Sequence, residues 1–303
     1  MTASAGVRER WLRLEDLDLC VFEWGEVDAP TVVLLHATGF HGRCWDAVAE
    51  QLAFEYRVLA PDMRGHGRSG KQPPFTWKMF THDIEQMLEQ LGVVHAVGIG
   101  HSMGGHCMVG VAARQSGVLD RLVLVDPVIL PPEFYAMGES THGRMASVAE
   151  DLPVARRRNR WKNWQEMVAH LREREPFSNW RRRVLEDYCR YGLLAAEDGY
   201  TLACPPLVEA SIYMGNTKTD VYERLADVDI PVLVMRGRQS EMEEGRMNFS
   251  NSPTWPELAS RFPQGRDLYL PRHSHFIPME DPELIVMAVR EPESLSGDPA
   301  TTN

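Results

Sequence analysis

The chain has 303 residues, of which 44% are hydrophobic and 25% are charged, as in ordinary globular proteins. Its formal net charge of −11 argues against binding to nucleic acid or to an anionic membrane surface. Five scattered cysteines without a Cys-x-x-Cys pair predict reduced thiols, and no apolar run approaches the ~18 residues of a membrane span, so we expect a cytoplasmic protein.

The first 130 residues alternate between predicted strands and predicted helices. Alternating apolar positions at 12–24 favour an antiparallel edge hairpin. Apolar runs predict buried strands at 31–35, 56–60, 93–99 and 121–125. Helical spacing of apolar residues predicts helices at 45–52, at 76–91 and directly after residue 102. This alternation predicts an α/β fold with a mostly parallel, doubly wound sheet and right-handed crossovers.

The alternation is interrupted between residues 131 and 229. Helical patterns rich in Arg and Trp fill this segment, for example at 156–163 and 180–183, and we interpret them as helices with solvated faces and inward-facing aromatic residues. A strand at 230–237, a short helix at 256–262, a last strand at 267–270 and a closing helix at 282–289 follow. The tail, residues 291–303, is rich in Ser, Gly, Pro and Thr and is predicted to be disordered.

A Gly-x-Ser-x-Gly sequence joins the strand that ends near residue 99 to the helix that follows it. Ser102 therefore has to lie on a sharp, strained turn, which Gly100 and Gly104 permit because they carry no side chain that would clash. Such a turn exposes the serine hydroxyl and directs the N–H of Met103 toward the group that the serine attacks. This context predicts a nucleophilic serine.

A serine at pH 7 needs a base within hydrogen-bond reach, and the base needs a carboxylate to orient it. Ligands of a parallel sheet bind outside the carboxyl ends of the strands, where His36, His273 and His275 lie, with His66 further along its loop. We favour His275, which follows the last strand, and keep His273 as the alternative.

Two carboxylates compete for the role of the acid. Glu241 follows the strand at 230–237, and Asp126 ends the strand after the Ser102 helix. Either can also be explained structurally, Glu241 as a surface acid and Asp126 as a turn residue before a proline. For the oxyanion hole, the N–H of Thr38 in the turn at 36–40 would join that of Met103, with Phe40 behind it.

Four motifs resemble the α/β-hydrolase fold superfamily, over roughly residues 18–130 and 228–290. They are the segments 35–39, 62–69, 100–105 and 275–280. The resemblance implies a triad in the chain order serine, acid, histidine, with Ser102 and His275 at the motif positions. It also implies a hydrolase core of residues 1–130 and 230–290, into which residues 131–229 are inserted as a helical cap that roofs the pocket.

The chain departs from the pattern of this superfamily at two places. His36-Ala37 stands where His-Gly is usual, which would alter the oxyanion loop. The usual acid position holds Ser240, and Glu241 follows it, so we favour Glu241 as the acid and keep Asp126 as the alternative.

These residues predict hydrolysis of an uncharged or weakly polar small-molecule carboxylic ester, without a metal or organic cofactor. Hydrolases of carbon–carbon bonds in ring-cleavage products share Ser-Met-Gly-Gly but usually carry Asn at the place of His101, and cap arginines would suit their carboxylates. A ligand-binding receptor on a hydrolase scaffold is the alternative from another class. Cap aromatic residues suggest an apolar pocket or core packing; they are Phe134, Tyr135, Trp161, Trp164 and Trp180.

Overall fold

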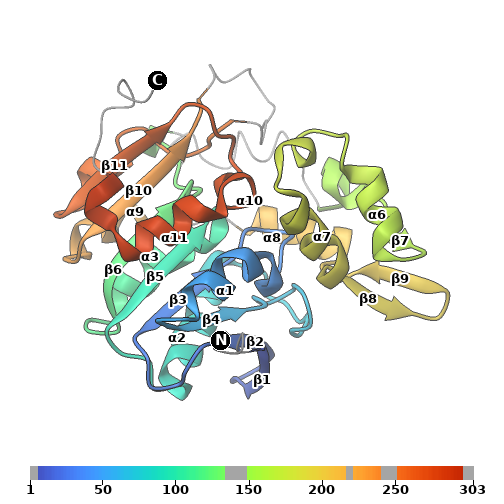
Figure 1. The fold of residues 1–303 in the computed structure, drawn as a ribbon, viewed down its shortest axis with the longest axis horizontal. Helices are drawn as coiled ribbons and strands as arrows, with labels where there is room; N and C mark the ends of the chain where they lie inside the picture. The colour runs from blue at the N-terminus through green and yellow to red at the C-terminus, as the bar shows by residue number, and fades with distance from the viewer. Residues whose placement is uncertain (1–5, 134–148, 216–220, 240–250, 296–303) are drawn as a thin grey trace.

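A computed structural model describes residues 6–133, 149–215, 221–239 and 251–295. An eight-stranded sheet with the order β1-β2-β4-β3-β5-β6-β10-β11 forms its centre (Figure 1). The strands are β1 (Arg8–Arg13), β2 (Asp18–Trp24), β3 (Thr31–Leu35), β4 (Arg57–Pro61), β5 (Ala96–His101), β6 (Leu119–Val125), β10 (Val232–Gly237) and β11 (Gly265–Leu270). The strand β2 pairs antiparallel with β1 and β4, and the other pairs are parallel. The predicted α/β fold is confirmed. The predicted edge hairpin at 12–24 is present but begins earlier, at Arg8.

The central strands are apolar on both faces because helices cover both sides of the sheet. In β3, Val32 and Leu34 face one layer of the core, while Val33 and Leu35 face the other. The helices α2 (Trp77–Gln90) and α3 (Met103–Arg114) pack on one face, and α1 (Asp46–Leu52) and α11 (Pro282–Arg290) pack on the other (Figure 1). This double winding leaves the carboxyl ends of the strands open for loops.

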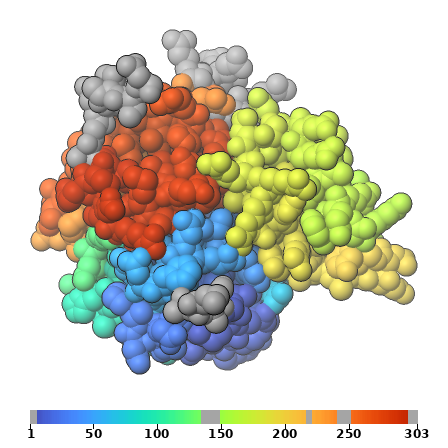
Figure 2. Space-filling model, in the orientation of Figure 1, coloured from blue at the N-terminus to red at the C-terminus, as the bar shows by residue number. Residues whose placement is uncertain are grey.

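The segment after β6 lies to one side of the main sheet, in yellow and green in Figures 1 and 2. Its helices are α6 (Trp164–Leu171), α7 (Arg182–Tyr191) and α8 (Pro206–Met214). It also holds a small antiparallel sheet of β7 (Arg160–Trp161), β8 (Leu193–Ala196) and β9 (Gly199–Leu202).

These three short strands are a correction to the sequence analysis, which predicted only helices here. Strands of two to four residues are too short for alternation to stand out, so hydrophobic patterning did not detect them. The available signal was the Asp198-Gly199 dipeptide at the turn from β8 into β9, where Gly199, the first residue of β9, has a φ of +102°.

The last described residues, up to 295, return to the edge strand β11 of the sheet. Here η6 (Leu258–Arg261) is a 3₁₀ turn where a short helix was predicted at 256–262. After α11, η7 (Pro292–Leu295) forms another such turn and its Pro292 carbonyl accepts a hydrogen bond from Arg266, so this part of the predicted disordered tail is folded. Within the four described ranges, the helices are all too short or too polar to cross a bilayer.

Candidate active site

Ser102 lies between β5 and α3 in a strained conformation, with a φ of +57° and a ψ of −118°. The turn is possible because Gly100 and Gly104, two residues away on either side, carry no Cβ. A Cβ on Gly100 would come within 2.4 Å of the Gly104 backbone, and one on Gly104 would come within 2.4 Å of the Leu35 carbonyl oxygen. The close approach of β3, β5 and α3 thus fixes the serine at the carboxyl end of the sheet.

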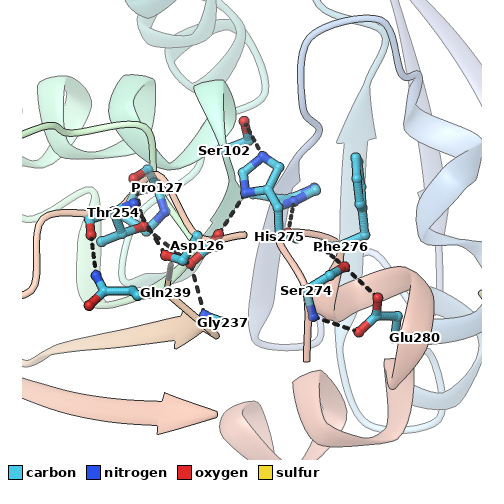
Figure 3. Close-up of polar contacts among 12 residues, drawn as sticks. Ser102, Asp126, Pro127, Gly237, Gln239, Thr254, Ser274, His275, Phe276 and Glu280 are labelled. Atoms are coloured by element: carbon cyan, nitrogen blue, oxygen red, sulfur yellow. Dashed lines mark hydrogen bonds and ion pairs between the residues drawn. The ribbon is translucent and has the colours of Figure 1, made fainter. Parts of the chain in front are cut away.

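His275 lies in the loop between β11 and the short helix α10 (Ile277–Glu280). Its Nε2 is 3.0 Å from the Ser102 Oγ (Figure 3). The loop is held by Glu280, whose carboxylate accepts hydrogen bonds from the backbone N–H and the hydroxyl of Ser274. The N–H of Phe276 in turn donates to the Ser274 hydroxyl at 3.1 Å. The imidazole therefore stands on a loop with its own internal hydrogen bonds.

Asp126 follows the end of β6, and its side chain is completely buried. Its Oδ2 lies 2.6 Å from the His275 Nδ1. Because an ionised carboxylate can only accept, the Nδ1 must carry the proton, and the Nε2 is left to accept from the Ser102 hydroxyl. The hydrogen bonds thus connect the three side chains in the order Asp126, His275, Ser102 (Figure 3).

The second carboxylate oxygen of Asp126 is held by three donors from the segment that begins at the end of β10. Its Oδ1 accepts hydrogen bonds from the Gly237 N–H at 3.0 Å, the Ser252 hydroxyl at 2.5 Å and the Thr254 hydroxyl at 3.3 Å. The Gln239 amide donates to the Thr254 carbonyl, which steadies this support (Figure 3). The carboxylate is therefore fixed in position on both of its oxygens.

Some of the other predicted site residues lie outside the described ranges, and His273 lies away from Ser102 and Asp126. Glu241, the favoured acid, lies outside the described residues, as do Phe134 and Tyr135 of the predicted aromatic set. His273, the alternative base, lies 3.5 Å from the Asp281 carboxylate at the start of α11. The acid that the structure brings to His275 is thus Asp126, the alternative.

The two predicted oxyanion residues are neighbours in space. The Thr38 hydroxyl donates to the Met103 Sδ at 3.3 Å, which joins the loop after β3 to the start of α3. Met103 is the first residue of α3, and the first N–H groups of a helix have no acceptor within the helix. The side chains are thus side by side at the positive end of this helix.

Two buried histidines fix the loop that carries Thr38. The Nε2 of His66 accepts from the Gly39 N–H, and the Nε2 of His36 accepts from the Met63 N–H, both at 2.9 Å. Burial lowers the pKa of His66 to about 3 and that of His36 well below its usual value, so both rings are neutral acceptors at pH 7. His36 and His66 were candidate bases in the sequence, and here they hold loops together.

His101, the residue before the serine, supports the site, a role that was not predicted from the sequence. Its Nε2–H donates to the His275 carbonyl at 2.9 Å, which ties the base loop to β5. Burial lowers the pKa of His101 well below its usual value, so this side chain stays neutral. Its position inside the Gly-x-Ser-x-Gly motif was the only sequence signal for it.

Aromatic residues from the segment after β6 pack against the loops of the site. Phe40 lies 5.2 Å from Tyr188 of α7 and 5.6 Å from Trp180, measured between ring centroids. Trp180 also contacts Phe276 at 5.4 Å, next to the base. Trp161 and Trp180 are buried in this apolar cluster and Trp164 packs at its margin, as core packing requires.

His41 links the same loop region to α7, and we predict that it makes stability depend on pH. Its Nε2–H donates to the Tyr188 carbonyl at 3.0 Å, and burial lowers its pKa to about 4. Between this value and the unfolded pKa near 6.5, the unfolded chain binds more protons, so falling pH favours unfolding. From about pH 7 to pH 5, wild type should lose ~2 kcal/mol of unfolding free energy relative to His41→Gln.

Urea unfolding of both proteins at the two pH values measures this difference. His95→Gln is the matched control because the His95 side chain is exposed on the surface. Equal pH dependence of wild type and His41→Gln would contradict a neutral, buried His41.

Comparison with known proteins adds four similarities. The model of a family described as "Alpha/beta hydrolase family" matches residues 32–288. The bifunctional esterase/perhydrolase DCH of Acinetobacter calcoaceticus is 25% identical over 287 residues, which cover 89% of this chain and 94% of that protein. Esterase YbfF of Escherichia coli is 22% identical and covers 80% of this chain and 85% of its own length. The solved structure of E-2-(acetamidomethylene)succinate hydrolase matches with a TM-score of 0.73 and 20% identity, over 94% of this chain and 98% of the other, a likeness of fold.

Proposed function

Because the chain belongs to the alpha/beta hydrolase family, we propose that it is a serine hydrolase that cleaves a carboxylic ester through an acyl-enzyme. The hydrogen bonds from Asp126 to His275 at 2.6 Å and from His275 to Ser102 at 3.0 Å are the observation that carries this proposal. They supply the nucleophile, its base and the group that orients the base.

In the proposed reaction, the Ser102 oxygen attacks the ester carbonyl carbon while His275 takes the hydroxyl proton. The imidazolium is stabilised by Asp126 and gives the proton to the departing alkoxide, so the alcohol leaves and an acyl-serine remains. A water molecule then attacks the acyl carbonyl and His275 accepts its proton. Return of that proton to the Ser102 oxygen releases the carboxylic acid and restores the free enzyme.

The N–H groups of Thr38 and Met103 are the proposed donors to the oxyanion, supported by the contact between their side chains. We propose that residues 131–229 form a cap over the site, since aromatic residues of this segment pack on Phe40 and Phe276. An apolar cap favours a small-molecule ester with an uncharged acyl or alcohol group. The two full-length relatives described above are named as esterases, in agreement with this substrate class.

Treatment of wild type with a fluorophosphonate probe, followed by peptide mass spectrometry, tests the proposal. We expect one label, on the peptide that contains Ser102, and turnover of p-nitrophenyl esters in a panel of acyl-chain lengths. Binding of such esters without labelling or turnover would favour the receptor alternative. Labelling without ester turnover, together with cleavage of a vinylogous diketone, would favour the carbon–carbon bond hydrolase.

A further inference from the structure

A buried ion pair from the cap segment lies directly against the loop that carries Thr38. Glu209, on α8, is only 4% exposed, and its Oε2 accepts a hydrogen bond from the Arg157 guanidinium at 2.6 Å. The same guanidinium donates from its other arm to the Tyr188 hydroxyl on α7 at 3.0 Å. The pair therefore connects three separate parts of the cap segment, namely α7, α8 and the turn after η3 (Pro153–Arg156).

The other oxygen of the Glu209 carboxylate contacts the proposed oxyanion loop at Gly39. A Cβ on Gly39 would lie 2.4 Å from the Glu209 Oε1, and the φ of +80° at this position is one that other residues rarely adopt. The Gly39 N–H donates a hydrogen bond to the His66 Nε2. The residue that follows Thr38 thus contacts both a buried histidine and a cap carboxylate.

The negative charge of Glu209 has to stay paired with Arg157 if the neighbouring loop is to bind an oxyanion. A buried ion pair contributes little net stability, but removal of one partner leaves an uncompensated charge. Without Arg157, the Glu209 carboxylate would stand unpaired beside the loop that is proposed to bind a developing negative charge. It would then take up a proton or move toward water, and either change alters its contact with Gly39.

We propose that the Arg157–Glu209 pair is a positioning element, which holds the loop at Thr38 and Gly39 in the geometry needed to bind the oxyanion. The inference rests on the proposed function, because the loop acts only if the chain forms a tetrahedral intermediate. Neither residue contacts the reacting serine in this scheme. Both act through Gly39, and the cap thereby takes part in catalysis as well as in substrate binding.

Two variants test the pair, with a matched control elsewhere. Arg157→Met should lower kcat on a p-nitrophenyl ester about 10- to 100-fold with little change in KM. This loss is smaller than the loss of kcat that follows removal of an oxyanion donor itself, because the donor is displaced and not removed. The double variant Arg157→Met/Glu209→Gln should recover part of this loss because it contains no unpaired charge. Glu50→Gln is the control. Glu50, on α1, forms an ion pair of the same 2.6 Å length with Arg183 of α7, so this pair also joins the core to the cap segment. Its kcat should stay near that of wild type.

Hydrogen exchange of the peptide covering residues 36–41 supplies a readout that does not depend on turnover. Faster exchange in Arg157→Met than in Glu50→Gln, together with the loss of kcat, supports the proposal. Unchanged kcat in Arg157→Met, or a loss of kcat without faster exchange in this peptide, overturns the inferred role of the ion pair. The proposed function still stands in either case if wild type turns over esters. A wild type that neither reacts with the probe nor turns over esters overturns the proposed function itself, and the inferred role in catalysis with it.

Discussion

Asp126→Asn is expected to lower kcat for ester hydrolysis about 10⁴-fold with little change in KM, as loss of the triad aspartate does in serine proteases. The amide that replaces the carboxylate presents a donor or a weaker acceptor to the His275 Nδ1. The imidazole then carries its proton on the Nε2 in a large fraction of molecules, and that nitrogen no longer accepts the Ser102 proton. Steady-state kinetics on a p-nitrophenyl ester measure the effect.

Glu241→Gln, prepared in parallel, separates the two candidate acids. If Asp126 is the acid, this second variant keeps kcat within about threefold of wild type, as a substitution outside the triad would. The opposite pattern, a large loss for Glu241→Gln and a small one for Asp126→Asn, would assign the acid to Glu241. Thermal unfolding of both variants checks that the fold survives, because Asp126 also accepts hydrogen bonds that join β6 to the segment after β10.

Ser102→Ala should lower kcat about 10⁶-fold and abolish labelling by the probe, going by the effect of removing the nucleophile of a serine protease. Without the Oγ no acyl-enzyme forms, and only binding and the oxyanion donors remain. Ser260→Ala, which alters an exposed serine on η6, is the control and should label like wild type. Equal labelling of wild type and Ser102→Ala would rule out Ser102 as the nucleophile.

A second substitution of Ser102 connects the site to stability. Because Ser102 has a φ of +57°, glycine should be more stable there than serine or alanine, by about 1 kcal/mol. Ser102→Gly would then be as inactive as Ser102→Ala but would unfold at a higher urea concentration. A urea midpoint lower for Ser102→Gly than for Ser102→Ala would contradict backbone strain at the nucleophile.

The centre of the main sheet was predictable because its strands contain apolar runs. Short runs such as residues 32–35 and 122–125 are typical of strands covered on both faces, and the helices between them leave few topologies. The turn at Ser102 was predictable for a similar reason, since Gly100 and Gly104 are required where β5 and α3 almost touch. The small sheet of β7, β8 and β9 was missed because its strands of two to four residues are too short for an alternating pattern to stand out.

The choice of acid could not be read from the sequence. Both Asp126 and Glu241 lie between Ser102 and His275 in the chain and follow a strand, and both are compatible with a purely structural role. Which carboxylate reaches the His275 Nδ1 depends on where three strand ends lie relative to one another in space. The supporting hydroxyls of Ser252 and Thr254 come from a segment over a hundred residues away in sequence, which no local pattern connects to Asp126.

The position of Asp126 at the end of β6 has a consequence for how the protein could diversify. The proposed acid directly follows a central strand, next to the strand that leads to the nucleophile, so both are placed by the buried centre of the sheet. Among the described residues from Gly237 onward, the donors to Asp126 are hydroxyl and backbone groups, which several residue types could replace. If Asp126 is the acid, directed evolution for new substrates could change these donors, provided that one donor to Asp126 is kept.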